Sequence, residues 1–264
     1  MNFISIITPT YNRANTISRT IESILLQEFT NWELIIVDDG GTDNTKQIIE
    51  NSFRDDRISY YYIENRGVCA ARNYGASKAT GEWLIFLDSD DCFHLGFLKS
   101  ISEIFSKTDY EINLFFSEIK LSGGNIKKKE LNKFTAHSLL SGNFAIKKSF
   151  FDELGGYDPI VTYSENTELA IRILKSNRKF KIHETVSLIY NLENTIERRK
   201  RYYKKKKKSA IYILKKHPSF FKMELGLKID YLKIISFCSY KTNDLYNFCK
   251  YGLLYLYYRI VINN

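Results

Sequence analysis

The sequence predicts an α/β fold, a mostly parallel sheet with flanking helices that is followed by a basic helical region. Two observations carry this prediction. Patterns typical of buried strands alternate with helical patterns at short spacing over residues 3–91, and basic residues are concentrated after residue 197. Because β-α-β crossovers give parallel strands, we expect functional side chains just beyond the carboxyl ends of those strands.

The expected elements follow from the periodicity of the apolar residues. Four apolar runs have the length and composition of buried strands, at 3–8, 33–37, 58–63 and 83–87. Three helical patterns separate them, at 16–27, from 42 onward, and at 68–79. Farther along, strands are expected at 112–121 and 142–146, with a turn and a basic loop at 123–129 between them.

The composition is that of a globular protein, with 44% hydrophobic and 26% charged residues. The chain starts without the basic leader of a secretory signal, and no apolar run approaches the ~20 residues of a membrane span. The four cysteines show no C-x-x-C spacing, which favours reduced thiols over disulfides or a zinc site. These features lead us to expect a cytoplasmic protein.

The charge divides the chain into two parts. Residues 1–197 contain 22 basic and 27 acidic residues, whereas residues 198–264 contain 17 basic and 3 acidic residues. We therefore expect a body over 1–197 and a basic, aromatic-rich helical region over 198–264.

Acidic side chains follow two of the expected strands. The strand at 83–87 leads into Asp88, Asp90 and Asp91, and the strand at 33–37 leads into Asp38 and Asp39. Burial does not account for adjacent carboxylates, because they repel one another and gain nothing from an apolar core. Such a cluster at a sheet edge suits a hard divalent cation, although acidic turns without a ligand are more common. Dehydrogenases and P-loop proteins are excluded, because neither the G-x-G-x-x-G nor the G-x-x-x-x-G-K-[ST] motif occurs.

Six sequence blocks, taken together, resemble the family 2 glycosyltransferases. They are ITPTYNR at 7–13, VDDG at 37–40, AARNYG at 70–75, FLDSDD at 86–91, FDELGGYD at 151–158 and YSENTEL at 163–169. The resemblance covers about residues 3–197. It implies a GT-A fold with a nucleotide-sugar-binding half at 1–110 and an acceptor half at 111–197. It also implies an inverting enzyme of bacterial polysaccharide or capsule synthesis that moves a sugar from a nucleotide diphosphate sugar, UDP-linked by preference, to a glycan or lipid-linked saccharide.

The resemblance also implies roles for individual residues. Asp90 would ligate Mn²⁺ or Mg²⁺ together with the diphosphate, and Asp88 would contact the ribose or a metal-bound water. Tyr11 offers a ring for stacking on a base, and Asp39 can accept a hydrogen bond from the imide N–H of uracil. Arg66 is a candidate for base or phosphate contact, as is Arg72, with a surface ion pair as the alternative for each. The full set of implied donor-binding residues is Pro9, Tyr11, Asp39, Arg66, Arg72, Asp88, Ser89 and Asp90. The preferred interpretation of Asp91 is a solvated or capping acid.

Inversion needs a base that takes the proton of the acceptor hydroxyl. The family usually places this base in a Glu-Asp pair at the start of a helix, and the pair here is Glu165-Asn166. An asparagine amide does not accept a proton usefully near pH 7. Three alternatives stay open: the role has moved to Glu165 or to Glu168, the protein is an inactive subunit that only binds, or the register differs. Glu168 is otherwise an ordinary acid on a helix surface.

The basic region has three candidate partners. An anionic membrane surface fits its charge and aromatic content, which would make the protein peripheral on the inner face of the cell membrane. Packing on the body or on a second subunit, as in a homodimer through 198–264, is the competing interpretation. Nucleic acid is disfavoured, because the body resembles a glycosyltransferase.

Overall fold

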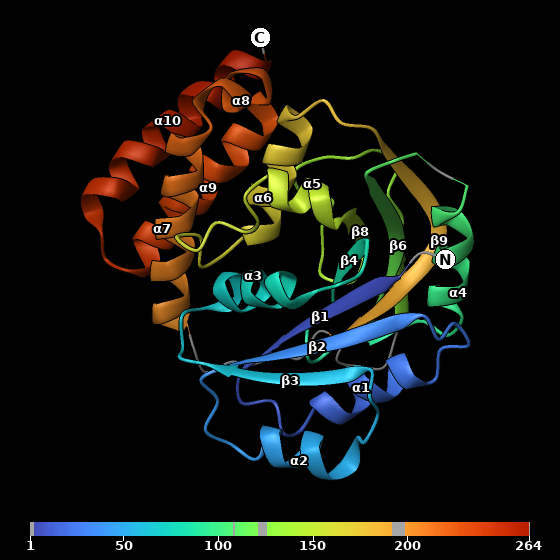
Figure 1. Cartoon of the computed structure of the whole chain (residues 1–264). Coiled ribbons are helices and arrows are strands. Elements are labelled where there is room, and N and C mark those ends of the chain that lie inside the picture. Colours follow the sequence, from blue (N-terminus) through green and yellow to red (C-terminus); the bar gives the residue numbers. More distant parts are fainter. Residues whose placement is uncertain (1–2, 108, 121–125, 192–198, 264) are drawn as a thin grey trace.

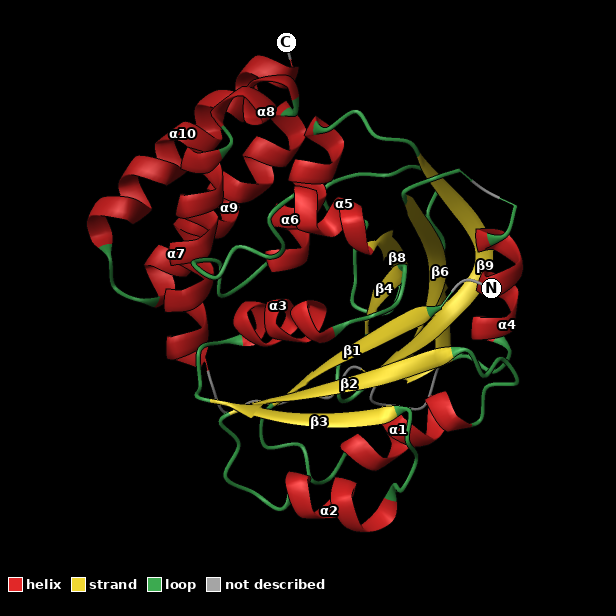
Figure 2. Cartoon of the chain, viewed as in Figure 1, coloured by secondary structure: helices red, strands yellow, loops and turns green. Residues whose placement is uncertain are grey.

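The computed structural model describes residues 3–107, 109–120, 126–191 and 199–263. In these residues the chain forms one nine-stranded sheet with the order β3-β2-β1-β4-β8-β6-β9-β5, and β7 pairs with β6. Helices cover both faces of the sheet, and a group of helices from the end of the chain lies to one side (Figures 1 and 2). The predicted α/β class is confirmed.

The first four strands are parallel. They are β1 (Ile4–Thr10), β2 (Trp32–Asp39), β3 (Ile58–Ile63) and β4 (Trp83–Phe86). β1 is central, with β2 on one side and β4 on the other, so this is where the strand order changes direction. In open α/β sheets such a point is where a ligand crevice forms at the carboxyl ends. Pro9 has no N–H to donate, and the pairing of β1 with β4 ends before it, at Ile7 and Phe86.

Two apolar cores lie on opposite faces of the sheet. One face is covered by α1 (Ile17–Leu25), α2 (Thr45–Ser52) and α4 (Phe97–Phe105), and the other by α3 (Val68–Lys78), α5 (Lys148–Glu153) and α6 (Glu165–Lys175) (Figure 1). On α1 the residues Ile17, Ile21 and Ile24 recur at helical spacing and are all fully buried. The small residues of α3 allow this helix to pack closely against the sheet. A Cβ on Gly75 would lie 2.5 Å from Ile7 Cγ2, so glycine lets α3 approach β1 closely.

The second half of the sheet is mixed. It contains β5 (Cys92–Phe93), β6 (Ile112–Lys120), β7 (Ile126–Lys129), β8 (Phe144–Lys147) and β9 (Phe180–Asn191). β8 runs antiparallel to β4 and to β6, whereas β9 runs parallel to β6. The prediction of a basic loop at 127–129 is wrong, because Lys127–Lys129 pair with Ser117–Ile119 as part of β7. The pairing partner lies elsewhere in the chain, and local periodicity does not reveal it. The predicted turn at 123–125 lies outside the described residues.

Four helices follow the sheet, α7 (Arg199–Lys216), α8 (Pro218–Met223), α9 (Leu225–Lys241) and α10 (Leu245–Asn263). They lie beside α6 (Figure 1). A third apolar core joins them to the body, because Val161 and Ile171 pack with Ile213, Phe221 and Ile235. Helices α7, α8 and α9 therefore pack on the body, which is one of the interpretations considered for the basic region. Within the described residues, none of the helices has the length and apolar character required to cross a membrane.

Candidate functional site

The loops after β1 and β2 are hydrogen-bonded to each other at the carboxyl edge of the sheet. Asn12 adopts a φ of 53°, in the left-handed region, and its Oδ1 accepts hydrogen bonds from the backbone N–H groups of Thr42 and Asp43. In return, the Asp43 carboxylate accepts from the backbone N–H of Ala14. Asparagine tolerates this backbone conformation better than most residues. The edge that carries Tyr11, which is 44% exposed, is thereby held in one arrangement.

The two aspartates at the end of β2 accept hydrogen bonds from different segments. Asp38 accepts hydrogen bonds from the Gly41 N–H at 2.7 Å and from the Tyr60 hydroxyl at 2.8 Å, so it caps the following loop. The carboxylate of Asp39 accepts from the backbone N–H groups of Arg66 and Gly67 at 2.8 and 2.9 Å. Asp39 thus joins the end of β2 to the loop before α3.

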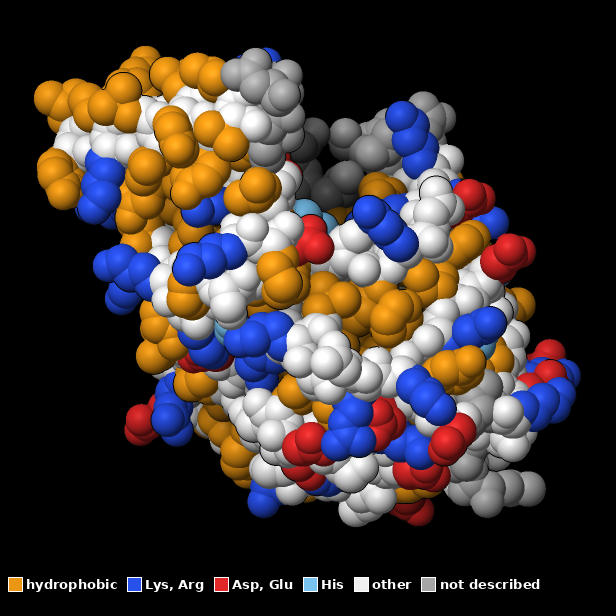
Figure 3. All heavy atoms as spheres, turned by 90° about the horizontal axis from the view of Figure 1, so that it is seen from above, with side chains coloured by type: hydrophobic (Ala, Val, Ile, Leu, Met, Phe, Trp, Pro, Cys, Tyr) orange, Lys and Arg blue, Asp and Glu red, His pale blue; other side chains and the backbone are white. Residues whose placement is uncertain are grey.

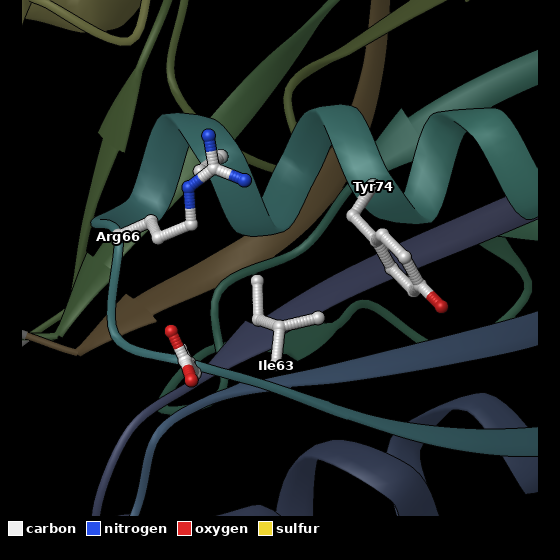
Figure 4. Close-up of a pocket in the computed structure, with 5 residues that line it drawn as sticks. Ile63, Arg66 and Tyr74 are labelled. Carbon is white, nitrogen blue, oxygen red and sulfur yellow. The ribbon is translucent and has the colours of Figure 1, made fainter.

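Arg66 itself is exposed, and it lines a shallow hollow of about 320 Å³ between β3 and α3. Figure 4 shows Arg66 extending from the loop before α3 and Tyr74 from α3, with Ile63 between them. The hollow is therefore next to the backbone amides that Asp39 binds. The guanidinium of Arg66 is available to a ligand at this edge.

The backbone of the Asp88–Asp91 turn is hydrogen-bonded to side chains at the start of α1. Three side chains donate to three successive carbonyl oxygens, each at 2.8 Å: Thr16 Oγ1 to Ser89, Arg19 Nη2 to Asp90, and Thr20 Oγ1 to Asp91. These donors have the i, i+3, i+4 spacing that places side chains on one helix face. Their contacts fix the turn before any ligand arrives.

The four residues of this turn differ in exposure. Ser89 and Asp91 are buried, so the expectation of a solvated Asp91 is wrong. The Oδ2 of Asp90 lies 3.2 Å from Arg13 Nη2, and the Asp90 side chain is 30% exposed. Burial raises the pKa of the Asp90 carboxyl, more than the neighbouring Arg13 lowers it. Asp88 and Asp90 are thus the accessible carboxylates of the turn.

Arg72 connects the two halves of the sheet. Its Nη2 donates to Asp88 Oδ1 and to Ser141 Oγ, both at 2.7 Å, and its Nη1 donates to Glu165 Oε1 at 2.9 Å. The guanidinium also lies over the ring of Tyr157, 5.1 Å from its centroid. Because Arg72 is only 1% exposed, the alternative of a surface ion pair is wrong. One buried guanidinium therefore links a carboxylate after β4 to a carboxylate that opens α6.

The segment before α6 is shaped by a glycine and an asparagine. Asn73 forms two hydrogen bonds with the backbone of Tyr157, one as donor and one as acceptor. Gly156 has a φ of 69°, and a Cβ there would lie 2.7 Å from Asn73 Oδ1. The Tyr157 hydroxyl then donates to Asn166 Oδ1 at 2.8 Å. Asn166 is thus bonded to a buried tyrosine, while Glu165 remains 17% exposed.

Glu168 is fully buried rather than exposed on a helix surface. Its carboxylate is paired with Arg172 and Lys216, both at 2.7 Å, and with His217 at 3.0 Å. Burial alone raises the pKa of Glu168, but hydrogen bonds from His217, Arg172 and Lys216 outweigh burial and lower it to about 2. Lys216 and His217 come from the C-terminal helices, so Glu168 connects those helices to the body.

The donor set present fits a divalent cation of the magnesium type. Among the described residues no group of three His, Cys, Asp or Glu side chains could hold a metal. Mg²⁺ and similar cations are commonly bound by only one or two carboxylates together with substrate phosphates and water. Asp88 and Asp90 provide two carboxylates on one turn, which meets that requirement.

Sequence reasoning assigned no role to several residues that build this site. Arg13, Thr16 and Thr20 contact the Asp88–Asp91 turn, and Ser141 and Tyr157 surround Arg72. The helical spacing of Thr16 and Thr20 was the only local signal. The other residues are more than 60 positions from the groups they contact, so only the fold brings them together.

Comparison with known proteins places this site in a family. A model described as "Glycosyl transferase family 2" matches residues 5–160. An uncharacterized glycosyltransferase of Rickettsia conorii is 40% identical over 141 residues, which are 53% of this chain and 22% of that protein. Another, of Rickettsia typhi, is 30% identical over 212 residues, 73% of this chain and 65% of that protein. TuaG of Bacillus subtilis, assigned to teichuronic acid biosynthesis, is 40% identical over 118 residues, 41% of this chain and 47% of TuaG.

The chain spans only about a fifth of the length of three rickettsial relatives, between 17% and 22%. Solved structures of S. aureus TarS have a similar fold. The complex of residues 1–349 with UDP has a TM-score of 0.65 at 20% identity, covering 89% of this chain and 80% of that TarS fragment. The complex with UDP-GlcNAc has a TM-score of 0.66 at 18% identity, covering 91% and 81%. The expected GT-A type of fold is confirmed by this similarity, and since the family model spans more than half of the sequence, the chain belongs to glycosyl transferase family 2.

Proposed function

We propose that this family 2 glycosyltransferase is a metal-dependent inverting enzyme, which moves a sugar from a UDP-sugar to a glycan or lipid-linked saccharide. The observation that carries the proposal is the position of Arg72. Its guanidinium holds Asp88, on the turn proposed to bind the donor, and Glu165, on the acceptor side. Two carboxylates of opposite halves are thereby kept at one edge of the sheet, where donor and acceptor would meet.

The nucleotide is proposed to bind between Tyr11 and the loop that Asp39 holds. The exposed ring of Tyr11 can stack on a base. Each carboxylate oxygen of Asp39 accepts one backbone hydrogen bond, and a carboxylate offers about four acceptor positions. Asp39 therefore retains capacity for the imide N–H of uracil, which cytosine lacks. TarS, which has a similar fold, forms complexes with UDP and UDP-GlcNAc, and this supports a UDP-sugar as the donor here.

The diphosphate gains negative charge as the sugar leaves. Asp90 and Asp88 would hold Mn²⁺ or Mg²⁺, which supplies positive charge that stabilises the leaving diphosphate. The exposed Arg66 adds a second positive group at the same edge. Arg72 is buried, so we propose that it positions Asp88 and Glu165 rather than contacting the donor.

Glu165 is the proposed base. Its Oε1 accepts from Arg72, which orients the carboxylate and leaves Oε2 to take the proton of the acceptor hydroxyl. The two other candidates are less suitable. Asn166 is an amide bonded to Tyr157, and Glu168 is fully buried with a pKa of about 2.

The acceptor is proposed to be a growing polysaccharide or its lipid-linked precursor. Support comes from TuaG, which is assigned to teichuronic acid biosynthesis and is 40% identical over 118 residues. A cytoplasmic enzyme would use cytoplasmic UDP-sugars for this reaction.

The experiment has two stages. A thermal-shift screen of uridine, guanosine and cytidine diphosphates, with and without Mn²⁺, identifies the base and the cation together, and UDP with Mn²⁺ should give the largest rise in melting temperature. UDP release from a panel of UDP-sugars with polysaccharide acceptors then measures turnover. Glu165→Gln should lower kcat at least 100-fold and leave the UDP shift unchanged, whereas Asn166→Ala should retain activity. Equal activity of Glu165→Gln and wild type would reject Glu165 as the base.

A second candidate function is a subunit that binds nucleotide sugar without turnover. Asn166 at the position usually occupied by aspartate is the observation that favours it. In that case wild type would bind UDP but show no turnover, and Asn166→Asp alone would create activity.

A further inference from the structure

The last helix, α10, has an apolar surface that is exposed among the described residues. Five of its side chains recur at helical spacing along the side opposite α9: Tyr246, Leu253, Leu256, Tyr257 and Ile260. We call these residues the outer stripe of α10. They are between 53% and 71% exposed, although a largely apolar helix is normally buried. Apolar patches of this kind mark sites of contact with another surface.

The opposite side of α10 accounts for its attachment to the protein. Tyr251, Gly252, Tyr255 and Tyr258 are half-buried and recur at helical spacing toward α9. Lys228 of α9 donates to the Tyr258 hydroxyl at 2.6 Å, and Gly252 lies close to Ser236. None of the α10 side chains that the structure describes is buried. Within the described part of the chain, α10 is therefore attached through the side opposite the outer stripe.

Two lysines lie near the start of the outer stripe. The ammonium of Lys250 lies over the Tyr246 ring, and that of Lys241 lies over the rings of Phe237 and Tyr240. Only three acidic residues occur in 198–264, and one of them, Asp244, is paired with Lys207. Figure 3 shows hydrophobic side chains gathered over the C-terminal helices, with Lys and Arg side chains beside them.

We propose that the outer stripe of α10 and its flanking lysines dock the protein on an anionic phospholipid surface. Apolar and tyrosine side chains enter the interface between headgroups and acyl chains, while lysines remain at the level of the phosphates. Charge favours this surface over a second copy of the chain. The charged residues of α10 are Lys250 and Arg259, and the helix has no acidic residue, so a two-fold dimer through this face would bring like charges together. An anionic leaflet has the opposite charge.

The test is flotation of the full chain with vesicles of phosphatidylcholine alone, or of phosphatidylcholine with 30% phosphatidylglycerol. Wild type should float with the anionic vesicles at low salt and less at high salt. Leu253→Glu with Ile260→Glu should lower the partition coefficient at least tenfold. The matched control is Leu26→Glu with Leu95→Glu, which alters two equally exposed leucines of the body and should bind as wild type.

A second pair of variants tests the charges. Lys241→Gln with Lys250→Gln should weaken binding about fivefold for each lysine removed. Lys46→Gln with Lys107→Gln, at exposed positions of the body, should have no effect. Far-ultraviolet circular dichroism checks that every variant is folded. Failure of folded wild type to bind anionic vesicles at low salt overturns the proposal. So does a dimer in light scattering that dissociates in the Leu253→Glu, Ile260→Glu variant, because the stripe would then bind a second copy.

Discussion

Glu168 offers the sharpest test of how the C-terminal helices are held on the body. Its buried carboxylate faces Arg172, Lys216 and His217, and Glu168→Gln removes the charge while retaining the shape. Removing one member of a buried ion pair costs about 3–5 kcal/mol, because the remaining charges lose their partner. The lowered pKa of Glu168 gives a second value for this loss in the free energy of unfolding. A decrease from 4.5 to about 2 corresponds to about 3 kcal/mol of stability at pH 7.

The pH dependence has a definite sign. Because the pKa of Glu168 is lowered on folding, its contribution is complete above about pH 4.5 and is lost as the pH falls toward 2. Urea unfolding of wild type and Glu168→Gln should therefore differ by about 3 kcal/mol at pH 7 and by about 1 kcal/mol at pH 3. Hydrogen exchange should also accelerate in α7, which ends at Lys216, and in α8, which follows His217.

The control for this prediction is Glu153→Gln. Glu153 pairs with Arg178 at 2.8 Å, but its side chain is 56% exposed, so its removal should cost less than about 1 kcal/mol. The reasoning is refuted if Glu168→Gln costs no more than Glu153→Gln at pH 7. It is also refuted if the difference from wild type is the same at pH 7 and pH 3.

Two further predictions concern the site. Gly156→Ala should lower the free energy of unfolding by about 1–3 kcal/mol in thermal denaturation, because its φ is positive and the new Cβ would lie 2.7 Å from Asn73 Oδ1. Gly155→Ala, with a φ of 79° and no atom within 4 Å of the Cβ, should cost less, and an equal loss would argue against the steric contact. Arg72→Lys should destabilise the protein by about 2–4 kcal/mol and remove sugar transfer, because one ammonium cannot replace a guanidinium that bonds three side chains. Arg178→Lys, at an exposed pair, should leave stability close to that of wild type, and an equally small effect at Arg72 would contradict the proposed positioning role.

Local patterns were sufficient for the nucleotide-binding half of the fold. The apolar runs at 33–37 and 58–63 became β2 and β3, and the small residues after Gly67 became α3, each within two residues of the expected bounds. These elements are encoded locally, because alternation of burial has a period of 2 or 3.6 residues along the chain. The Asp88–Asp91 turn was located for the same reason, since an apolar strand that ends in carboxylates is visible without any tertiary information.

The way in which the residues of the candidate site act together depends on long-range packing. The order of residues alone predicts the fold class, the sheet edge that carries the candidate site and the uneven charge of the chain. It did not distinguish Glu165, which shares a buried guanidinium with Asp88, from Glu168, which is buried against Lys216 and His217. Both acids lie on the same helix at similar positions, and their difference comes from partners between 48 and 93 residues away along the chain. Contacts over such separations depend on the packing of whole elements, which no local pattern of residues records.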